Sequence, residues 1–131
     1  LAAAGADVLE SRATADGGGG ATALFLAHGQ RAAYLYAARA DVVLSGHEHS
    51  YERFAPQTPW AKASRQGIRQ FVVGTGGADL LGFAKRKPNS QRRISHTHGV
   101  LELVLHPASY RWRFVSEDGA VLDRGGPVAC H

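Results

Sequence analysis

Hydrophobic runs alternate with polar and glycine-containing segments along the first half of the chain and predict an α/β protein. Residues 22–27 (TALFLA) and 41–45 (DVVLS) are apolar runs that fit buried strands, and two adjacent valines favour the second. Residues 30–40 lie between these runs and predict a helix. A strand, a helix and a strand in succession predict a right-handed crossover, so the two strands should pair in parallel.

The second half of the chain predicts strands separated by longer loops. Residues 46–67 contain two prolines and predict a long irregular stretch, of the kind that is usually functional or mobile in a compact domain. The run 68–73 (IRQFVV) predicts a third strand, which the glycine-rich turn 74–77 ends. The elements expected after this turn are a basic loop at about 79–97, an antiparallel hairpin of 100–106 and 109–115, and a short strand at 120–123.

Residues 1–20 predict a helix and a connector that precede the α/β region. Residues 1–15 are rich in alanine, and Asp16 with the glycines at 17–20 predicts a flexible link. No Lys-Ser or Lys-Thr follows these glycines, so they do not form a P-loop. We interpret residues 1–131 as a single partial domain, and the absence of methionine indicates that the sequence begins inside a longer one.

Composition narrows the class of protein. Of the 131 residues, 44% are hydrophobic and 20% are charged, which is typical of a globular chain. No apolar run approaches the roughly 20 residues of a membrane span. The single cysteine, Cys130, cannot form an internal disulfide.

Much of the net charge of +4 comes from one basic segment, which contains Lys85, Arg86, Lys87, Arg92 and Arg93. Two interpretations stay open for it: a solvated surface loop, or a rim that attracts anionic substrates. Nucleic-acid binding is not indicated, because no aromatic residues interleave the charges and no binding module is visible.

The chemistry-bearing motif is SGHEHSYER at residues 45–53, directly after an expected strand. Open α/β sheets place their ligand sites at the carboxyl ends of strands. In an extended segment, residues two apart point the same way, so His47 and His49 would offer two imidazoles on one side of the loop. Imidazole nitrogen binds zinc, iron and similar ions. Two loop histidines without a metal are the alternative, and the preceding strand, the glycine and the following Tyr-Glu-Arg favour the metal site.

The residues DVVLSGHEHSYERFAPQ (41–57) resemble the last metal-binding motif of the calcineurin-like metallophosphoesterase family, in its purple acid phosphatase-like branch. GIRQFVVGTGG (67–77) resembles the next strand and glycine turn of that family. HGVL at 98–101 and YRWRF at 110–114 resemble its closing hairpin. The resemblance covers residues 22–131, and it corresponds to the C-terminal part of the catalytic domain.

The resemblance implies a fold and an activity. The fold would be α/β, part of an α/β/β/α sandwich with a mixed sheet and a C-terminal antiparallel hairpin, and this chain would supply roughly one sheet with its helices. The reaction would be hydrolysis of phosphate esters by a metal-bound hydroxide, with divalent or trivalent ions in a dinuclear Fe, Zn or Mn centre. By the same analogy, the protein would be secreted or periplasmic.

The resemblance also suggests site residues. His47 matches the ligand of one metal and His49 the ligand of the other. His28 matches a metal ligand, a substrate-facing histidine, or a plain strand-end residue. Tyr51, Glu52 and Arg53 match positions that support the ligands or fix the loop, with a solvated turn as the alternative. The remaining histidines are interpreted as structural or solvent-exposed: His96, His98, His106 and His131.

Several ligand motifs of the family do not occur in this sequence. There is no Gly-Asn-His and no Gly-Asp-x-x-Asp, and the only asparagine is Asn89. Because these motifs supply the bridging carboxylate and an amide ligand, we expect a truncated or incomplete phosphoesterase that lacks the N-terminal half, with no catalytic residue assigned. The alternative is a non-catalytic metal-binding or protein-interaction module derived from this fold.

Overall fold

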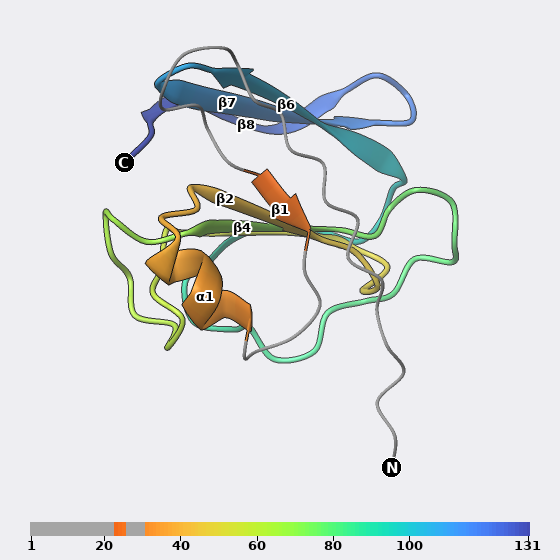
Figure 1. Cartoon of the computed structure of the whole chain (residues 1–131). Helices are drawn as coiled ribbons and strands as arrows, with labels where there is room; N and C mark the ends of the chain where they lie inside the picture. Colours follow the sequence, from red (N-terminus) through yellow and green to blue (C-terminus); the bar gives the residue numbers. More distant parts are fainter. Residues whose placement is uncertain (1–22, 26–30) are drawn as a thin grey trace.

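The computed structural model describes residues 23–25 and 31–131, and these residues form two stacked β-sheets with one helix (Figure 1). The five-stranded sheet has the order β1-β2-β4-β3-β5 and the three-stranded sheet the order β6-β7-β8. Parts of two sheets are therefore present, where the sequence led us to expect roughly one. The expected α/β class, with a mixed sheet and a C-terminal antiparallel hairpin, is confirmed.

The five-stranded sheet and its helix are built from β1 (Ala23–Phe25), α1 (Arg31–Ala37), β2 (Val42–Ser45), β3 (Tyr51–Phe54), β4 (Arg69–Val73) and β5 (Ser90–Ile94). Strand β2 pairs in parallel with β1 and with β4, which confirms the parallel pairing expected from the sequence for the first two strands. Strand β3 is antiparallel to both β4 and β5, so the sheet is mixed.

The helix ends earlier than its hydrophobic pattern suggested. Arg39 has a left-handed backbone with φ of 58°. The Arg39 N–H donates to the Tyr36 carbonyl at 3.1 Å, and the Ala40 N–H donates to the Leu35 carbonyl at 3.0 Å. This hydrogen-bond pair is a Schellman motif, which satisfies the last carbonyls of a helix and stops it.

The three-stranded sheet consists of β6 (Gly99–His106), β7 (Ser109–Ser116) and β8 (Val121–Ala129). Strands β6 and β7 form the expected hairpin, and the pairing of His106 with Ser109 leaves only Pro107 and Ala108 in the turn.

Three element predictions were wrong. The stretch 46–67 contains β3, and the basic loop 79–97 contains β5. Strand β8 continues to Ala129 instead of ending at 123. Strands β3 and β5 carry several charged residues, and they are stabilised by pairing with each other across more than 35 residues of sequence, which no local pattern shows.

The main hydrophobic core lies between the two sheets. The five-stranded sheet contributes Val42, Tyr51, Phe71 and Ile94, and the other sheet contributes Tyr110, Trp112 and Phe114. The rings of Tyr51 and Phe114 stack at 4.2 Å, and Phe71 meets Trp112 edge-on at 5.5 Å. Aromatic pairs of this geometry add stability beyond the area that they bury.

A second core lies on the opposite face of the five-stranded sheet, under α1 (Figure 1). Leu35 and Ala40 from the helix region pack there with Val43 and Ile68. Because neighbouring strand residues point to opposite faces, Val42 enters the first core and Val43 the second.

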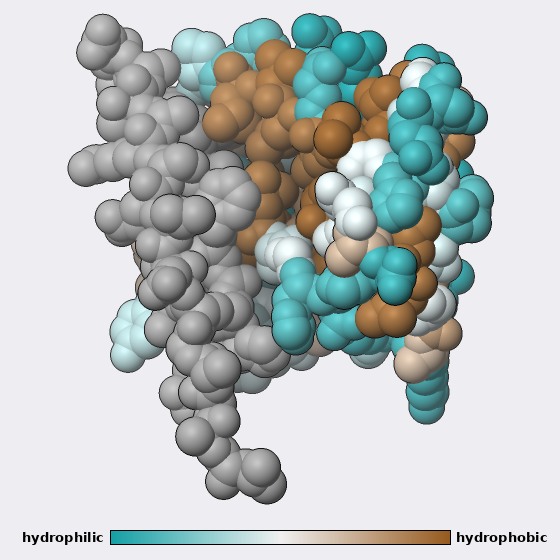
Figure 2. Space-filling model, turned by 90° about the vertical axis from the view of Figure 1, so that its right-hand side faces the viewer, coloured by the Kyte–Doolittle hydropathy of each residue, from teal (hydrophilic) through white to brown (hydrophobic). Residues whose placement is uncertain are grey.

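Figure 2 shows one end of the molecule, where hydrophobic residues gather in the upper half of the face and hydrophilic residues line the right-hand edge.

No helix in the described ranges is long and apolar enough to cross a membrane.

The expected helix and connector at residues 1–20 lie outside the described residues. The interpretation of 1–131 as one partial domain therefore stays a prediction.

Candidate metal centre

The His-Glu-His motif occupies the loop that joins β2 to β3. Strand β2 ends at Ser45, β3 begins at Tyr51, and the bends 47–50 lie between them. Strand β2 lies between its parallel neighbours β1 and β4, so the loop leaves the sheet at an edge where carboxyl ends of parallel strands meet. This is the position at which open α/β sheets bind ligands.

The loop is a tight turn and not an extended segment. His47 has a left-handed backbone with φ of 76°, and the Ser50 N–H donates to the Glu48 carbonyl at 2.7 Å. The reasoning that His47 and His49 share a side because the segment is extended was therefore wrong, since alternation holds only for strand geometry. Their common role as ligands stays a prediction.

The turn is seated on Gly74, the first residue after β4. The Gly74 N–H donates to the Ser50 carbonyl at 3.0 Å. A Cβ placed on Gly74 would lie 1.8 Å from the Glu48 carbonyl oxygen, so only glycine admits this approach. The glycine-rich turn therefore packs against the histidine loop. The two segments meet because they follow β2 and β4, which are adjacent parallel strands.

His49 has a fixed ring orientation. Its Nδ1 lies 2.8 Å from the carbonyl oxygen of Asp79. Because a carbonyl oxygen can only accept, Nδ1 carries the proton and Nε2 keeps its lone pair. The backbone is tied to the same segment, since the Leu81 N–H donates to the His49 carbonyl at 2.9 Å. A backbone carbonyl on one ring nitrogen is a frequent partner of a histidine that binds metal through the other.

The other expected ligands are less constrained. His47 is exposed, and His28 falls outside the described residues, beyond the end of β1 at Phe25. Within the described part of the chain, no three histidine, cysteine or acidic side chains converge closely enough to hold a metal ion. Two imidazoles, one of which is hydrogen-bonded to a backbone carbonyl, are suitable ligands for zinc or iron. A complete site would need further ligands beyond these two.

Tyr51, Glu52 and Arg53 belong to β3, so the alternative that they form a solvated turn was wrong. Tyr51 is fully buried, and its hydroxyl donates to Asp123 Oδ2 at 2.7 Å. Burial, and then the hydrogen bond to Asp123, raise the pKa of the Tyr51 phenol far above its usual range. Tyr51 therefore stays a neutral donor, and its expected role in supporting the metal ligands stays a prediction.

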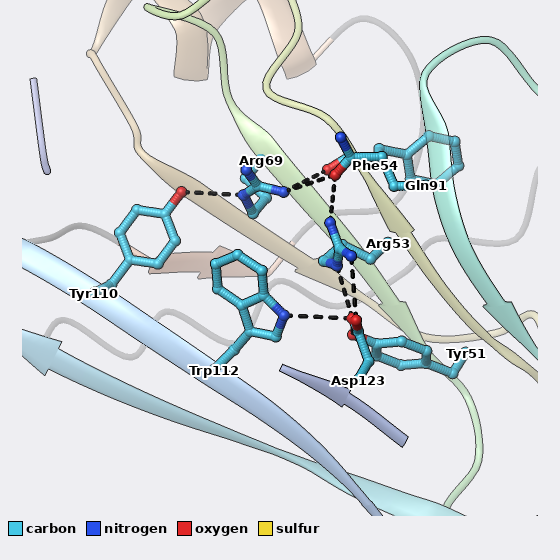
Figure 3. Close-up of polar contacts among 8 residues, drawn as sticks. All are labelled: Tyr51, Arg53, Phe54, Arg69, Gln91, Tyr110, Trp112 and Asp123. Atoms are coloured by element: carbon cyan, nitrogen blue, oxygen red, sulfur yellow. Dashed lines mark hydrogen bonds and ion pairs between the residues drawn. The ribbon is translucent and has the colours of Figure 1, made fainter. Parts of the chain in front are cut away.

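Asp123 collects several donors between the sheets (Figure 3). Arg53 contacts it twice, from Nε to Oδ2 at 2.7 Å and from Nη2 to Oδ1 at 3.1 Å. Trp112 adds its indole N–H at 3.3 Å. Burial acts to raise the pKa of the Asp123 carboxyl, but the bonds from Arg53 and Tyr51 together outweigh it and lower the pKa.

Arg69 forms a second polar junction beside the first (Figure 3). It donates to the Tyr110 hydroxyl at 3.3 Å, to the Phe54 carbonyl at 3.1 Å and to Gln91 Oε1 at 3.2 Å. Arg53 also donates to Gln91 Oε1. Its guanidinium and that of Arg69 lie 5.2 Å and 4.7 Å from the Trp112 ring centroid, within cation–π range.

Four members of these junctions lie outside the motif and had no predicted role: Arg69, Gln91, Trp112 and Asp123. The only hint was the alternation of charged and aromatic residues in 109–115. Asp123 lies 70 residues from Arg53 in sequence, so their contact is decided by sheet packing.

The face of β3 that points away from the second sheet carries Glu52. Its Oε1 lies 3.6 Å from Arg93 Nε, and both atoms are buried without a hydrogen bond in the part that the structure describes. Arg93 also lies 4.1 Å from the Phe83 ring centroid. At least this member of the basic segment is therefore packed and not a freely solvated rim charge.

The remaining histidines differ from one another. His96 and His106 are exposed. His98 Nε2 lies 3.0 Å from the Ala78 carbonyl oxygen. The His131 ring and backbone N–H both contact Asp41 Oδ1, at 2.9 Å and 3.0 Å.

Comparisons with known proteins give partial matches to one group. The chain is 38% identical over 84 residues to purple acid phosphatase 21 of Arabidopsis thaliana, which is 60% of this chain and 19% of that protein. It is 37% identical over 94 residues to probable purple acid phosphatase 20 of the same plant, which is 66% of this chain and 21% of that protein. The chain therefore spans about a fifth of the length of these relatives. No family model matches it.

A solved structure has a similar fold. Purple acid phosphatase PPD1 from yellow lupin (Lupinus luteus) seeds superimposes with a TM-score of 0.61 over 72% of this chain and 18% of that one, at 24% identity. At this identity the likeness concerns the fold. It agrees with the sequence matches, which point to the C-terminal part of such proteins.

Proposed function

We propose, from the premise that this chain is a purple acid phosphatase-like sequence of the calcineurin-like metallophosphoesterases, that it supplies the C-terminal half of a phosphate-ester hydrolysing site. In this proposal, His47 and His49 each bind one ion of a dinuclear metal centre. His28 is the third histidine proposed for the site. The substrate class is phosphate esters, as the relatives' name of phosphatase suggests.

One observation carries the metal proposal. The Asp79 carbonyl accepts from Nδ1 of His49 at 2.8 Å, so Nε2 of the neutral ring carries the lone pair that a metal ion would bind, at the carboxyl edge of the sheet. A histidine that binds a metal through Nε2 needs this tautomer, because the lone pair must stay on that nitrogen. The tight turn at His47 and its seat on Gly74 support the same interpretation, because a metal site requires ligands held on a defined backbone.

The chemistry that such a metal pair supplies is Lewis-acid polarisation of the phosphoryl oxygens. The residues of this chain hold and orient the ligands. His49 offers Nε2 to the metal, and the Asp79 carbonyl keeps the proton on Nδ1. Gly74 lets the backbone of the histidine loop pack closely against the turn after β4. No residue of the described part is assigned a proton-transfer role.

We further propose that the carboxylate and amide ligands come from protein outside this sequence. The sequence lacks the motifs that carry them, and it spans about a fifth of the length of the relatives. On this basis the chain by itself is an incomplete enzyme. Export from the cytoplasm is proposed by analogy with the family alone.

A second candidate is a non-catalytic module that binds one metal ion or associates with a partner. The observation in its favour is that no cluster of three ligand side chains occurs among the described residues. The coding sequence upstream of Leu1 discriminates between the two. Gly-Asp and Gly-Asn-His motifs in the same frame support the enzyme, and a stop codon there supports the module.

The metal proposal is tested by titrating the chain with zinc in a calorimeter. Because this chain lacks the other ligands of a dinuclear centre, we expect it to bind zinc weakly through His47 and His49 together, and His47→Ala, which leaves one of these two imidazoles, should weaken binding roughly tenfold or more. His106→Ala is the matched control, since this exposed histidine ends β6, and it should leave the affinity unchanged. Equal affinity in wild type and His47→Ala would sink the metal site.

The incompleteness proposal is tested by assaying p-nitrophenyl phosphate hydrolysis with added zinc, manganese and iron. We expect negligible turnover from this chain alone. Turnover in the common enzyme range of about 1–10³ per second would contradict the missing-ligand argument.

A further inference from the structure

Two histidines from different loops form hydrogen bonds with the backbone carbonyls of two neighbouring residues, Ala78 and Asp79. His49, between β2 and β3, donates to the Asp79 carbonyl at 2.8 Å. His98, directly before β6, contacts the Ala78 carbonyl at 3.0 Å through Nε2. Since a carbonyl can only accept, Nε2 of His98 is the donor. The two acceptors belong to successive peptide planes that join at the Cα of Asp79.

Among the described residues, the segment that carries these carbonyls has one further tie to the histidine loop, since the Leu81 N–H donates to the His49 carbonyl at 2.9 Å. Gly76 and Gly77 precede it, and a Cβ built on either would meet nothing within 4 Å. Gly77 has a φ of 138°, a backbone conformation that glycine adopts readily. Ala78 and Asp79 are themselves exposed, so side-chain packing does little to fix the direction of their carbonyls, and the two histidine hydrogen bonds contribute to it.

His98 is itself well anchored. The Gly99 N–H donates to the Thr75 carbonyl at 3.2 Å, and the Thr75 hydroxyl donates to the Gly99 carbonyl at 2.8 Å. The His98 carbonyl accepts from the Glu117 N–H at 3.0 Å. The backbone around His98 is therefore hydrogen-bonded to residues that follow strands of both sheets. This fixes the position from which the His98 ring donates to the Ala78 carbonyl.

We propose that His98 is a positioning residue for His49. Its Nε2–H fixes the Ala78 carbonyl, this sets the direction of the next carbonyl at Asp79, and that carbonyl keeps the proton of His49 on Nδ1. His49 Nε2 is thereby presented to the metal. The proposal deepens the proposed function and rests on it for the metal, whereas the effect on the His49 tautomer is independent of any metal.

The direct test is the tautomer of His49 in the metal-free, ¹⁵N-labelled full chain, read from long-range ¹H–¹⁵N correlations at pH about 8, where histidines are largely neutral. In wild type we expect the Nδ1–H form to predominate. His98→Leu removes the donor and should give a mixture of both tautomers. His98→Gln places an amide N–H near the position of Nε2 and should restore the wild-type signals.

His96→Leu is the matched control, because His96 is an exposed histidine two residues away. It should leave the His49 signals unchanged. Zinc affinity should follow the fraction of the Nδ1–H tautomer, with a loss of roughly two- to fivefold in His98→Leu, recovery in His98→Gln and no change in His96→Leu.

Unchanged His49 signals in a folded His98→Leu chain would overturn the positioning role. So would equal disturbance by His98→Leu and His98→Gln. If the leucine variant does not fold, His98→Asn takes its place, because the shorter amide cannot reach the Ala78 carbonyl. Absence of zinc binding in wild type would overturn the metal proposal and leave the tautomer result to decide the role of His98.

Discussion

At the scale of single residues, Asp123 joins the two sheets. Its carboxylate accepts from Tyr51 and Arg53 of β3 and from Trp112 of β7, while Asp123 itself lies on β8. The side chains of Arg53 and Asp123 are only 14% and 8% exposed, so water replaces little of this interaction if it is lost. A buried guanidinium without its carboxylate is costly.

Replacing Asp123 by Asn should therefore destabilise the protein strongly. We expect a loss of roughly 3 kcal/mol in the free energy of unfolding, because Arg53 keeps its charge without the compensating carboxylate. Glu102→Gln is the control. It breaks the exposed pair of Glu102 with Arg113, and such pairs contribute about 0.2–1 kcal/mol. Urea denaturation of both variants measures the difference, and equal losses would contradict the inter-sheet role of Asp123.

The same carboxylate predicts a pH dependence of stability. The pKa of Asp123 is lowered in the folded state, whereas the pKa of an aspartate in an unfolded chain is about 3.9. As the pH falls through about 4, the unfolded chain takes up this proton first, so the contribution of Asp123 is full above that pH and is lost below it.

The measurement compares wild type with Asp123→Asn. The difference in their urea midpoints should be constant between pH of about 7 and about 5 and should narrow as the pH falls further. A difference that widens in acid would show that the sign of the linkage, and hence the lowered pKa, is wrong.

At the scale of elements, the candidate site depends on contact between two loops that follow adjacent parallel strands. The loop after β2 carries the histidines, and the turn after β4 begins with Gly74, which the Glu48 carbonyl approaches. Neither loop is defined by its own hydrogen bonds alone, because the Gly74 N–H serves the Ser50 carbonyl of the other.

Replacing Gly74 by Ala should disturb the histidine loop. The added Cβ would fall 1.8 Å from the Glu48 carbonyl oxygen, so one backbone has to move. We expect a loss of about 1–3 kcal/mol in stability, as for other overpacked positions, together with weaker zinc binding. Gly76→Ala is the matched control, since nothing lies within 4 Å of its Cβ. Identical denaturation curves for the two variants would refute the close contact at Gly74.

At the scale of the whole molecule, the described part has one core that neither sheet could form alone. Tyr51 and Phe71 of the five-stranded sheet bury their rings against Phe114 and Trp112 of the other. A sheet that is hydrophobic on one face has to bury that face against another element. The two sheets should therefore unfold together.

Replacing Phe114 by Ala should test this coupling. The side chain is fully buried, so its removal should cost about 3–5 kcal/mol. Hydrogen exchange should accelerate in peptides from β4 as well as in those from β7. Val100→Ala is the control on an exposed position, 64% accessible, and should change stability by no more than about 0.5 kcal/mol. Faster exchange confined to β7 would mean that the sheets open separately.

The length of each predicted strand depended on where a pattern was interrupted. The expected strand at 120–123 stops at a pair of glycines, yet β8 runs through Gly125 and Gly126. The structure gives the reason: a Cβ on Gly125 would lie 2.3 Å from the Trp112 ring. Gly125 makes room for a tryptophan from β7, Gly126 makes room for Arg111 and the Tyr110 carbonyl, and neither glycine ends the strand.

The sequence by itself determined the strands at 41–45 and 68–73, the parallel pairing of 41–45 with the strand before the helix, the 100–115 hairpin and the presence of a histidine loop after β2. Each of these rests on a continuous local pattern of apolar residues or on a turn between neighbours in the chain. The ligand roles of His28, His47 and His49 stay predictions.

Only the tertiary structure decided that residues 51–54 and 90–94 are strands, that Arg53 belongs to Asp123, and that the Asp79 carbonyl orients His49. These features depend on partners 30 to 70 residues away in sequence. YERF and SQRRI become strands because each pairs its backbone with a neighbouring strand. Arg53 meets Asp123 of the opposite sheet, and Glu52 lies 3.6 Å from Arg93 of the neighbouring strand. Local propensity contains neither partner, because both are brought into contact by the burial of the aromatic core between the sheets.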